Sequence, residues 1–142
     1  MSQPTRQDAM RQLLDGIQAD LHSYQQMLDL IAQQFEAAVS HQSERLGQIA
    51  ADISALVDVL QARRAQRVEL ATLLAGPGPK MDQVFALLKP EARARLEADW
   101  AQLEAMVQTA REMGRRNAEL LAEQYTIMQR VLHGDDQTYE PV

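Results

Sequence analysis

Residues 10–38, MRQLLDGIQADLHSYQQMLDLIAQQFEAA, decide the fold. Apolar residues recur in this stretch at alternating steps of four and three through four heptads, at Met10, Leu14, Ile17, Leu21, Tyr24, Leu28, Ile31, Phe35 and Ala38. This spacing predicts one long helix with a coiled-coil seam. We expect the helix to begin near Thr5, a suitable N-cap with Asp8 three residues later, and to end between residues 39 and 43.

A second helix with the same kind of seam is predicted to begin at Ser43, which we expect to be its N-cap. Its seam runs through Leu46, Ile49, Ile53, Leu56, Leu60, Arg63, Arg67, Leu70 and Leu74. The sequence GPGP at residues 76–79 ends it, because proline lacks a backbone N–H and glycine favours non-helical geometry. Residues 81–88, MDQVFALL, then predict a short helix that covers one end of a bundle.

The third long helix is predicted to begin at Pro90 and to end at Gly134. Its seam runs through Leu96, Trp100, Leu103, Val107, Ala110, Gly114, Asn117, Leu121, Tyr125, Met128 and Leu132. At about 1.5 Å per residue the three helices measure roughly 50, 48 and 65 Å, so the third is the longest. We therefore expect an all-α fold: an antiparallel three-helix bundle of coiled-coil-like helices in one domain, residues 1–134, with a flexible tail, residues 135–142.

Composition and charge exclude several functions. The 142 residues include no cysteine, which removes disulfide frameworks, Cys-ligated zinc, iron–sulfur clusters and thiol nucleophiles. A net charge of −6 disfavours nucleic-acid binding. No apolar run approaches the roughly 18 residues of a membrane span, and the polar start lacks the apolar core of a signal peptide. We expect a soluble cytoplasmic protein without membrane insertion.

The sequence contains no recognisable catalytic or metal-binding motif. The three histidines, His22, His41 and His133, lie in separate predicted elements, and none follows an acidic residue by three positions. Glycine-rich phosphate loops and a nucleophile elbow are absent from the 142 residues. We therefore expect no enzyme activity, no metal and no cofactor.

Three arginines, Arg63, Arg64 and Arg67, form the densest positive cluster. They could bind an acidic partner, or they could form a salt-bridge layer, because folding the first hairpin about residue 40 places them opposite Asp15 and Asp20. We favour the salt bridges, in which the arginine stems also cover apolar surface.

Asn117 is the only asparagine and falls in the seam of the third helix. A lone asparagine in a seam often fixes the register of packed helices. Folding the second hairpin about residue 82 places Gly114 and Asn117 near Gly47 and Ala50. We therefore expect the second and third long helices to approach closely at these small residues.

The end of the third long helix carries more apolar surface than one packed face needs. The excess residues cover about 160° of the helix, against the roughly 100° of one packed face; they are Leu120, Leu121, Tyr125, Ile127, Met128, Val131 and Leu132. Either residues 81–88 or the N-terminal turn fold over this surface, or an amphipathic helix of another protein binds it. Periodicity alone leaves both interpretations open.

With these features in view, the chain resembles the FlgN family of flagellar export chaperones. Trp100 is followed after seventeen residues by Asn117-Ala118-Glu119-Leu120-Leu121, similar to the family's Trp and Asn-Gly-x-Leu/Ile-Leu on its final helix, with alanine in place of glycine. Residues 67–74, RVELATLL, followed by Gly76, are similar to the Arg-x-x-Leu-Leu that ends its second helix. Thr138-Tyr139-Glu140-Pro141 stands where members carry Tyr-Gly.

The resemblance implies a cytoplasmic chaperone of flagellum assembly. Such a chaperone binds C-terminal helical segments of the hook-associated proteins of the hook–filament junction and delivers them to the type III export apparatus. The implied client-binding residues are Asn117, Leu120, Leu121, Ile127, Met128, Val131 and Leu132, to which the apolar surface adds Tyr125. Tyr139 is the implied docking residue for the export gate. The alternative is a structural coiled coil that self-associates through its third long helix; we expect a monomer or weak homodimer.

Overall fold

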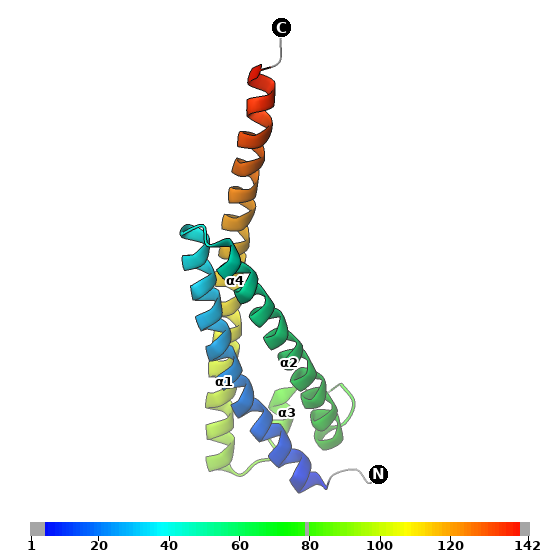
Figure 1. The fold of residues 1–142 in the computed structure, drawn as a ribbon. Helices are drawn as coiled ribbons and strands as arrows, with labels where there is room; N and C mark the ends of the chain where they lie inside the picture. The colour runs from blue at the N-terminus through cyan, green and yellow to red at the C-terminus, as the bar shows by residue number, and fades with distance from the viewer. Residues whose placement is uncertain (1–4, 79, 140–142) are drawn as a thin grey trace.

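The fold was analysed in a computed structural model that describes residues 5–78 and 80–139, with side chains as far as His133. The chain forms four helices in these residues: α1 (Arg6–Val39), α2 (Ser43–Ala75), α3 (Met81–Phe85) and α4 (Pro90–Tyr139) (Figure 1). The described part contains no strand. The predicted all-α class is therefore confirmed.

The predicted start of α1 is confirmed. Thr5 is the N-cap, and its Oγ1 accepts a hydrogen bond of 3.1 Å from the backbone N–H of Asp8. This bond satisfies one of the N–H groups that the first turn of a helix leaves without a partner.

The turn between α1 and α2 has the geometry of a Schellman motif. The N–H of His41 donates to the carbonyl of Ala38, and the N–H of Gln42 donates to the carbonyl of Ala37. His41 adopts a left-handed φ of 55°. The prediction that Ser43 caps α2 is wrong: the compact turn makes Gln42 the N-cap, without a side-chain hydrogen bond, and Ser43 is already helical.

Replacing His41 by glycine is expected to stabilise the fold. A non-glycine residue is strained in the left-handed region, so His41→Gly should raise the free energy of unfolding by about 0.5–1 kcal/mol. Urea denaturation followed by circular dichroism measures the change. The control His22→Gly, at an exposed position inside α1, should lower it by roughly 0.3–0.5 kcal/mol. A loss of stability in His41→Gly would contradict the strain at this turn.

Helix α1 is the central helix. Near one end of the molecule Arg6 Nη2 donates to the carbonyl of Leu74 at 2.9 Å, so α2 runs back along α1. Gln18 Nε2 donates to Asp99 Oδ2 at 2.6 Å, and Gln124 Nε2 donates to the carbonyl of Ala38 at 2.9 Å. Helix α4 is therefore parallel to α1 (Figure 1).

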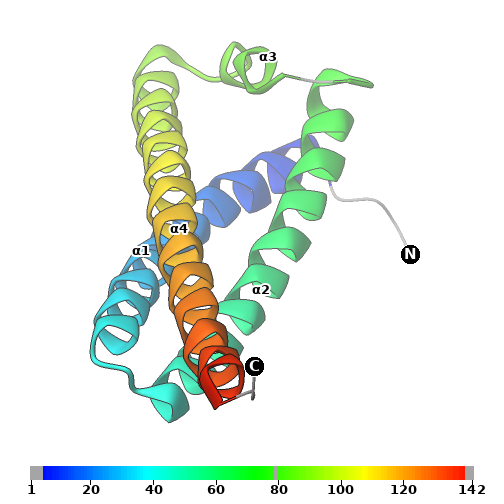
Figure 2. The same cartoon turned by 90° about the horizontal axis from the view of Figure 1, so that it is seen from above.

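The backbones of α2 and α4 do not approach each other closely. The contacts between long helices in the described residues are α1 with α2 and α1 with α4, and the views along and across the molecule show α2 diverging from α4 (Figure 2). The expected approach of Gly114 and Asn117 to Gly47 and Ala50 is therefore wrong. It assumed a closed bundle of three helices, whereas the backbone of α4 packs along α1 and, near Pro90, on α3, and stays apart from the backbone of α2.

The core is densest where α3 lies, at the end of the molecule that holds Pro90. Val84 and Phe85 of α3 are buried in a cluster with Leu13, Ile17, Leu70, Leu74, Leu96 and Leu103. The Phe85 ring also packs edge-on against Trp100, with ring centroids 6.4 Å apart. The short helix predicted within residues 81–88 is confirmed, although its helical turns stop at Phe85.

Helix α4 continues beyond its predicted end. It passes through Gly134 and reaches Tyr139, so the predicted stop at Gly134 is wrong. Glycine weakens a helix by about 1 kcal/mol but keeps its backbone N–H, so a single glycine does not interrupt the hydrogen-bond ladder. Of the predicted tail, residues 135–139 lie in α4, and residues 140–142 lie outside the described residues.

Candidate partner-binding surface on α4

The seam that joins α4 to α1 is regular and ends abruptly. Buried residues recur every seven positions at Leu96, Leu103, Ala110 and Asn117. One heptad further, Gln124 bonds to Ala38, and α1 ends at Val39. The fifteen residues of α4 beyond Gln124 extend about 22 Å at 1.5 Å per residue. We call residues 125–133, the part with described side chains, the overhang.

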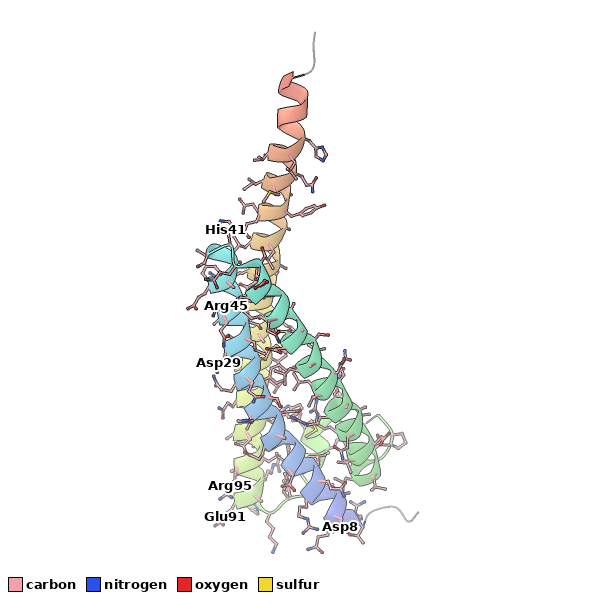
Figure 3. All side chains as sticks on the ribbon, in the orientation of Figure 1. Asp8, Asp29, His41, Arg45, Glu91 and Arg95 are labelled. Carbon is pink, nitrogen blue, oxygen red and sulfur yellow. The ribbon has the colours of Figure 1, made fainter. Side chains whose placement is uncertain are left out.

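The overhang presents large apolar side chains to solvent. Five of them have between 52% and 66% of their surface exposed: Tyr125, Ile127, Met128, Val131 and Leu132. Figure 3 shows side chains projecting from the part of α4 that extends past the turn at His41. Burial of one such side chain contributes about 1.5–3 kcal/mol, so this cluster of five exposed residues is a candidate interaction surface.

Neither predicted internal cover reaches the overhang. Residues 81–88 pack at the opposite end of α4, where Val84 and Phe85 lie with Leu96. The first turn of α1 is at that end too, because Arg6 contacts the carbonyl of Leu74 in the last turn of α2. Of the two interpretations left open by periodicity, self-coverage by these described segments is wrong.

Asn117 occupies a different environment from the other predicted client-binding residues. It is 3% exposed, and its Nδ2 donates to the carbonyl of Ile31 at 2.8 Å and to Gln34 Oε1 at 2.9 Å. Its amide is thus used inside the contact between α1 and α4, as expected of a residue that fixes register. Leu120 and Leu121 are half-buried where the packed part of α4 meets the overhang.

Tyr139, the implied export-gate residue, is the last residue of α4. Its side chain lies outside the described part of the chain.

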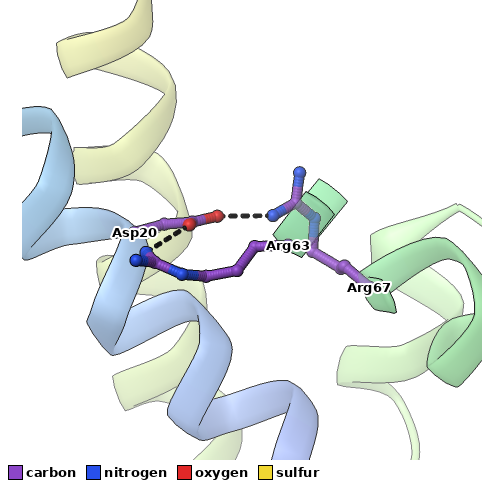
Figure 4. Close-up of polar contacts among 3 residues, drawn as sticks. All are labelled: Asp20, Arg63 and Arg67. Atoms are coloured by element: carbon purple, nitrogen blue, oxygen red, sulfur yellow. Dashed lines mark hydrogen bonds and ion pairs between the residues drawn. The ribbon is translucent and has the colours of Figure 1, made fainter. Parts of the chain in front are cut away.

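Arg63 and Arg67 form the salt-bridge layer that we favoured. Their Nη1 atoms donate to the two carboxylate oxygens of Asp20 at 2.8 and 2.7 Å (Figure 4). The Asp20 side chain is 4% exposed, and the Arg67 guanidinium also lies 5.2 Å from the centre of the Trp100 ring. Arg64 is exposed, and among the described residues neither it nor Asp15 forms an ion pair.

An open groove runs between α2 and α4, and residues of α1 form its floor. Its volume is about 910 Å³, and its walls include Val57, Leu60 and Arg64 on α2 and Trp100, Val107 and Arg111 on α4. The groove could not be predicted while α2 and α4 were expected to touch. One sequence feature could have indicated it: Arg67 occupies a seam position of α2, and an arginine there is incompatible with a closed apolar contact to α4.

The described residues hold no group of three or more His, Asp or Glu side chains that could bind a metal ion. His22, His41 and His133 are all exposed. No described helix combines the length and the apolar character needed to cross a membrane.

Comparison with known proteins identifies the family. A family model described as FlgN protein matches residues 9–134, from the first turns of α1 to the overhang of α4. No match was found among curated proteins or among solved structures. Because the matched segment covers far more than half of the chain, this protein belongs to the FlgN family of flagellar export chaperones.

Proposed function

We propose that this chaperone binds C-terminal helical segments of the hook-associated proteins through the overhang of α4 and delivers them to the type III export apparatus. The observation that carries the proposal is the cluster of five apolar side chains, each more than half exposed, on the part of α4 that extends past α1. The surface comprises the overhang residues Tyr125, Ile127, Met128, Val131 and Leu132, together with Leu120 and Leu121 at its lower edge.

The face of α4 that binds α1 continues into the overhang. Val131 follows Asn117 by two heptads and Ile127 follows Leu120 by one, so these side chains extend the same seam beyond the end of α1. A client helix on the overhang would therefore continue the path of α1. It would meet α4 through the same seven-residue packing that α1 uses.

The free energy available suits reversible binding. Covering about 600 Å² of apolar surface contributes on the order of 15 kcal/mol at about 25 cal/mol per Å². Loss of translational and rotational freedom opposes this by about 4–15 kcal/mol. Micromolar or tighter binding is compatible with these terms, and release requires no nucleotide.

In this proposal Asn117 is a positioning residue. Its two hydrogen bonds hold α4 in register on α1, and this register determines which α4 side chains pass the end of α1. The overhang then presents its apolar face at a fixed distance beyond the turn between α1 and α2.

Deletion of residues 138–142 is expected to separate the two activities. We propose that Tyr139 docks the chaperone to the export gate, so the truncated chain should bind clients with unchanged affinity while secretion of hook-associated proteins falls. Affinity is measured with purified proteins, and secretion is measured as client in the culture medium. A weaker client affinity in the truncated chain would refute this division.

A structural coiled coil remains the competing function. The same exposed face could serve only to join two copies through α4, in which case the interface would be permanent and no hook-associated protein would displace it.

Co-expression with the C-terminal 50 or so residues of each hook-associated protein tests the proposal against this alternative. Size-exclusion chromatography should show the chaperone co-eluting with at least one of the segments. A chaperone that elutes as a stable homodimer and is left unchanged by all the segments would overturn the proposed function.

A further inference from the structure

The end of α1, at the base of the overhang, offers hydrogen-bond acceptors. The turn after α1 satisfies the carbonyls of residues 36–38. The carbonyls of Val39 and Ser40 accept no hydrogen bond from the backbone of the described residues. The side-chain amide of Gln124 adds a third acceptor. Its Nε2 donates to Ala38, and its Oε1 accepts none of the hydrogen bonds formed in the described part of the chain.

These backbone acceptors point toward the overhang. Carbonyl groups in the last turn of an α-helix point along its axis, away from the N-terminus, and together carry the effect of about half a negative charge. Helix α4 is parallel to α1 and extends past its end (Figure 1). A helix that lies on the overhang and continues the path of α1 therefore has one of its ends on these acceptors.

The end of α1 stays electronegative. Its last turn contains no basic residue and includes Glu36. Arg45, in the first turn of α2, donates to Gln42 Oε1 at 3.2 Å and lies 3.9 Å from Glu36 Oε2. Neither contact involves the carbonyl of Val39 or Ser40. Positive charge and hydrogen-bond donors are therefore favoured at this end of α1.

The seam of α4 is built for a parallel helix. It binds α1 in parallel, and its positions continue beyond α1 at Val131, two heptads after Asn117. Side chains on an α-helix tilt toward its N-terminus. A client helix that runs in the direction of α1 therefore meets the seam with the same side-chain geometry as α1, whereas a reversed helix tilts its side chains the other way.

We propose that the client helix binds the overhang with its N-terminus on the end of α1 and its C-terminus toward Tyr139. The first four backbone N–H groups of an α-helix have no partner within the helix. Those of the client donate to the carbonyls of Val39 and Ser40 and to Gln124 Oε1. A reversed client would bring its own free carbonyls against those of α1, so the end of α1 selects the direction of binding.

Resting on the proposed function, this orientation also places the two ends of the client segment. Its C-terminus lies on the side of Tyr139, the last residue of α4 and the proposed docking residue for the export gate. The part of the client that precedes the segment leaves at the turn between α1 and α2. The bulk of the client therefore lies away from the end of the chaperone that docks.

Paramagnetic broadening tests the direction, because the natural chain contains no cysteine and a single label site can be introduced. A nitroxide is attached to Glu44→Cys, exposed in the first turn of α2. Spectra are recorded of an isotope-labelled C-terminal segment of a hook-associated protein in complex with this chain. A helix as long as the fifteen residues of α4 beyond Gln124 spans about 22 Å, so we expect at least about threefold stronger broadening in its first turn than in its last.

His133→Cys is the matched label site. His133 is exposed near the far end of the overhang, on the opposite side of α4 from the seam, so its label should give the reverse gradient. Strongest broadening of the last client turn by the Glu44→Cys label, or no gradient with either label, would overturn the orientation and leave the proposed function standing. A segment that does not bind would overturn the proposed function and the orientation with it.

Charge at residue 40 gives an independent test, because its effect has opposite signs for the two directions. Ser40 is the exposed C-cap of α1. A carboxylate beside the free N–H groups of the client favours binding, and an ammonium group opposes it. Ser40→Asp should bind the client segment about two- to fivefold more tightly than the natural chain, and Ser40→Lys about two- to fivefold more weakly. Both effects should shrink at high salt.

Gln66→Asp and Gln66→Lys make the same changes in net charge at an exposed position in the second half of α2, away from the turn. They should leave the affinity nearly unchanged. Tighter binding by Ser40→Lys than by Ser40→Asp would show a reversed client and overturn the orientation. Equal affinities of the two Ser40 variants would overturn the contact between the client and the end of α1.

Discussion

Met128→Asp is expected to weaken client binding about 100-fold, a loss of about 3 kcal/mol. Met128 is 57% exposed on the overhang, near the middle of the apolar surface. A client helix would cover it, and a carboxylate there would lose its hydration without gaining a partner. Isothermal titration calorimetry with the client segment gives the affinity, and urea denaturation gives the stability.

Stability should change by less than about 0.5 kcal/mol, because Met128 lies beyond the end of α1 and belongs to neither buried cluster. Thr126→Asp is the matched control: it adds the same charge at nearly the same height, but its exposed side chain lies on the opposite, polar side of α4. An equal loss of affinity in both variants would point to charge repulsion instead of an apolar contact. Leu121→Asp is a poorer test, because Leu121 is half-buried and its replacement also disturbs the fold.

Asp20→Ala is expected to cost about 2–4 kcal/mol of stability. The change leaves two guanidinium groups, those of Arg63 and Arg67, without the carboxylate that accepts from both. Breaking a buried ion pair typically costs 3–5 kcal/mol. We expect somewhat less because the arginine side chains retain 24% and 20% exposure and can reach water. Urea denaturation measures the free energy of unfolding.

Two further variants separate the unpaired charges from the loss of packing. Arg64→Ala, at the exposed and unpaired neighbour, should change stability by less than about 0.5 kcal/mol. Asp20→Leu combined with Arg63→Met and Arg67→Met should recover most of the loss, since a buried ion pair can be replaced by apolar side chains at little cost. A triple variant as unstable as Asp20→Ala would contradict the electrostatic explanation.

The sequence was sufficient to predict the elements and the contact between α1 and α2. A hairpin folded at the short turn after residue 39 has only one antiparallel register, so Asp20 could be matched to Arg63 and Arg67 before the fold was known. The strong break at residues 76–79 likewise separated α2 from α4. Local rules of this kind act within a few residues; they predicted the cap at Thr5 but misplaced the start of α2 at Ser43 and the end of α4 at Gly134.

The sequence was not sufficient to predict which helices pair. A heptad seam shows which face of α4 is buried, but an apolar face is compatible with α2 or α1 as its partner. The buried contact of Asn117 therefore appeared on α1, at Ile31 and Gln34, and not near Gly47. The groove between α2 and α4 exists because α4 pairs with α1 and not with α2.

The overhang itself was visible as an apolar arc that is too wide for one packed face. Its exposure depends on the relative heights of two helix ends, Val39 of α1 and Tyr139 of α4. We expected α4 to end at Gly134, so the sequence underestimated how far α4 extends beyond α1. The arc of 160° combines positions that extend the α1 seam, such as Val131, with neighbouring positions such as Tyr125, which lies on the same side of α4 as Val107 in the groove wall.

Hydrogen–deuterium exchange of the chaperone with and without a client segment tests most directly whether the overhang is the client-binding surface. The account predicts that backbone amides of residues 125–133 exchange rapidly in the free monomeric chain and become protected when the client binds, while α1 and α2 keep their exchange rates. Protection confined to α1 and α2, with residues 125–133 unchanged, would contradict it.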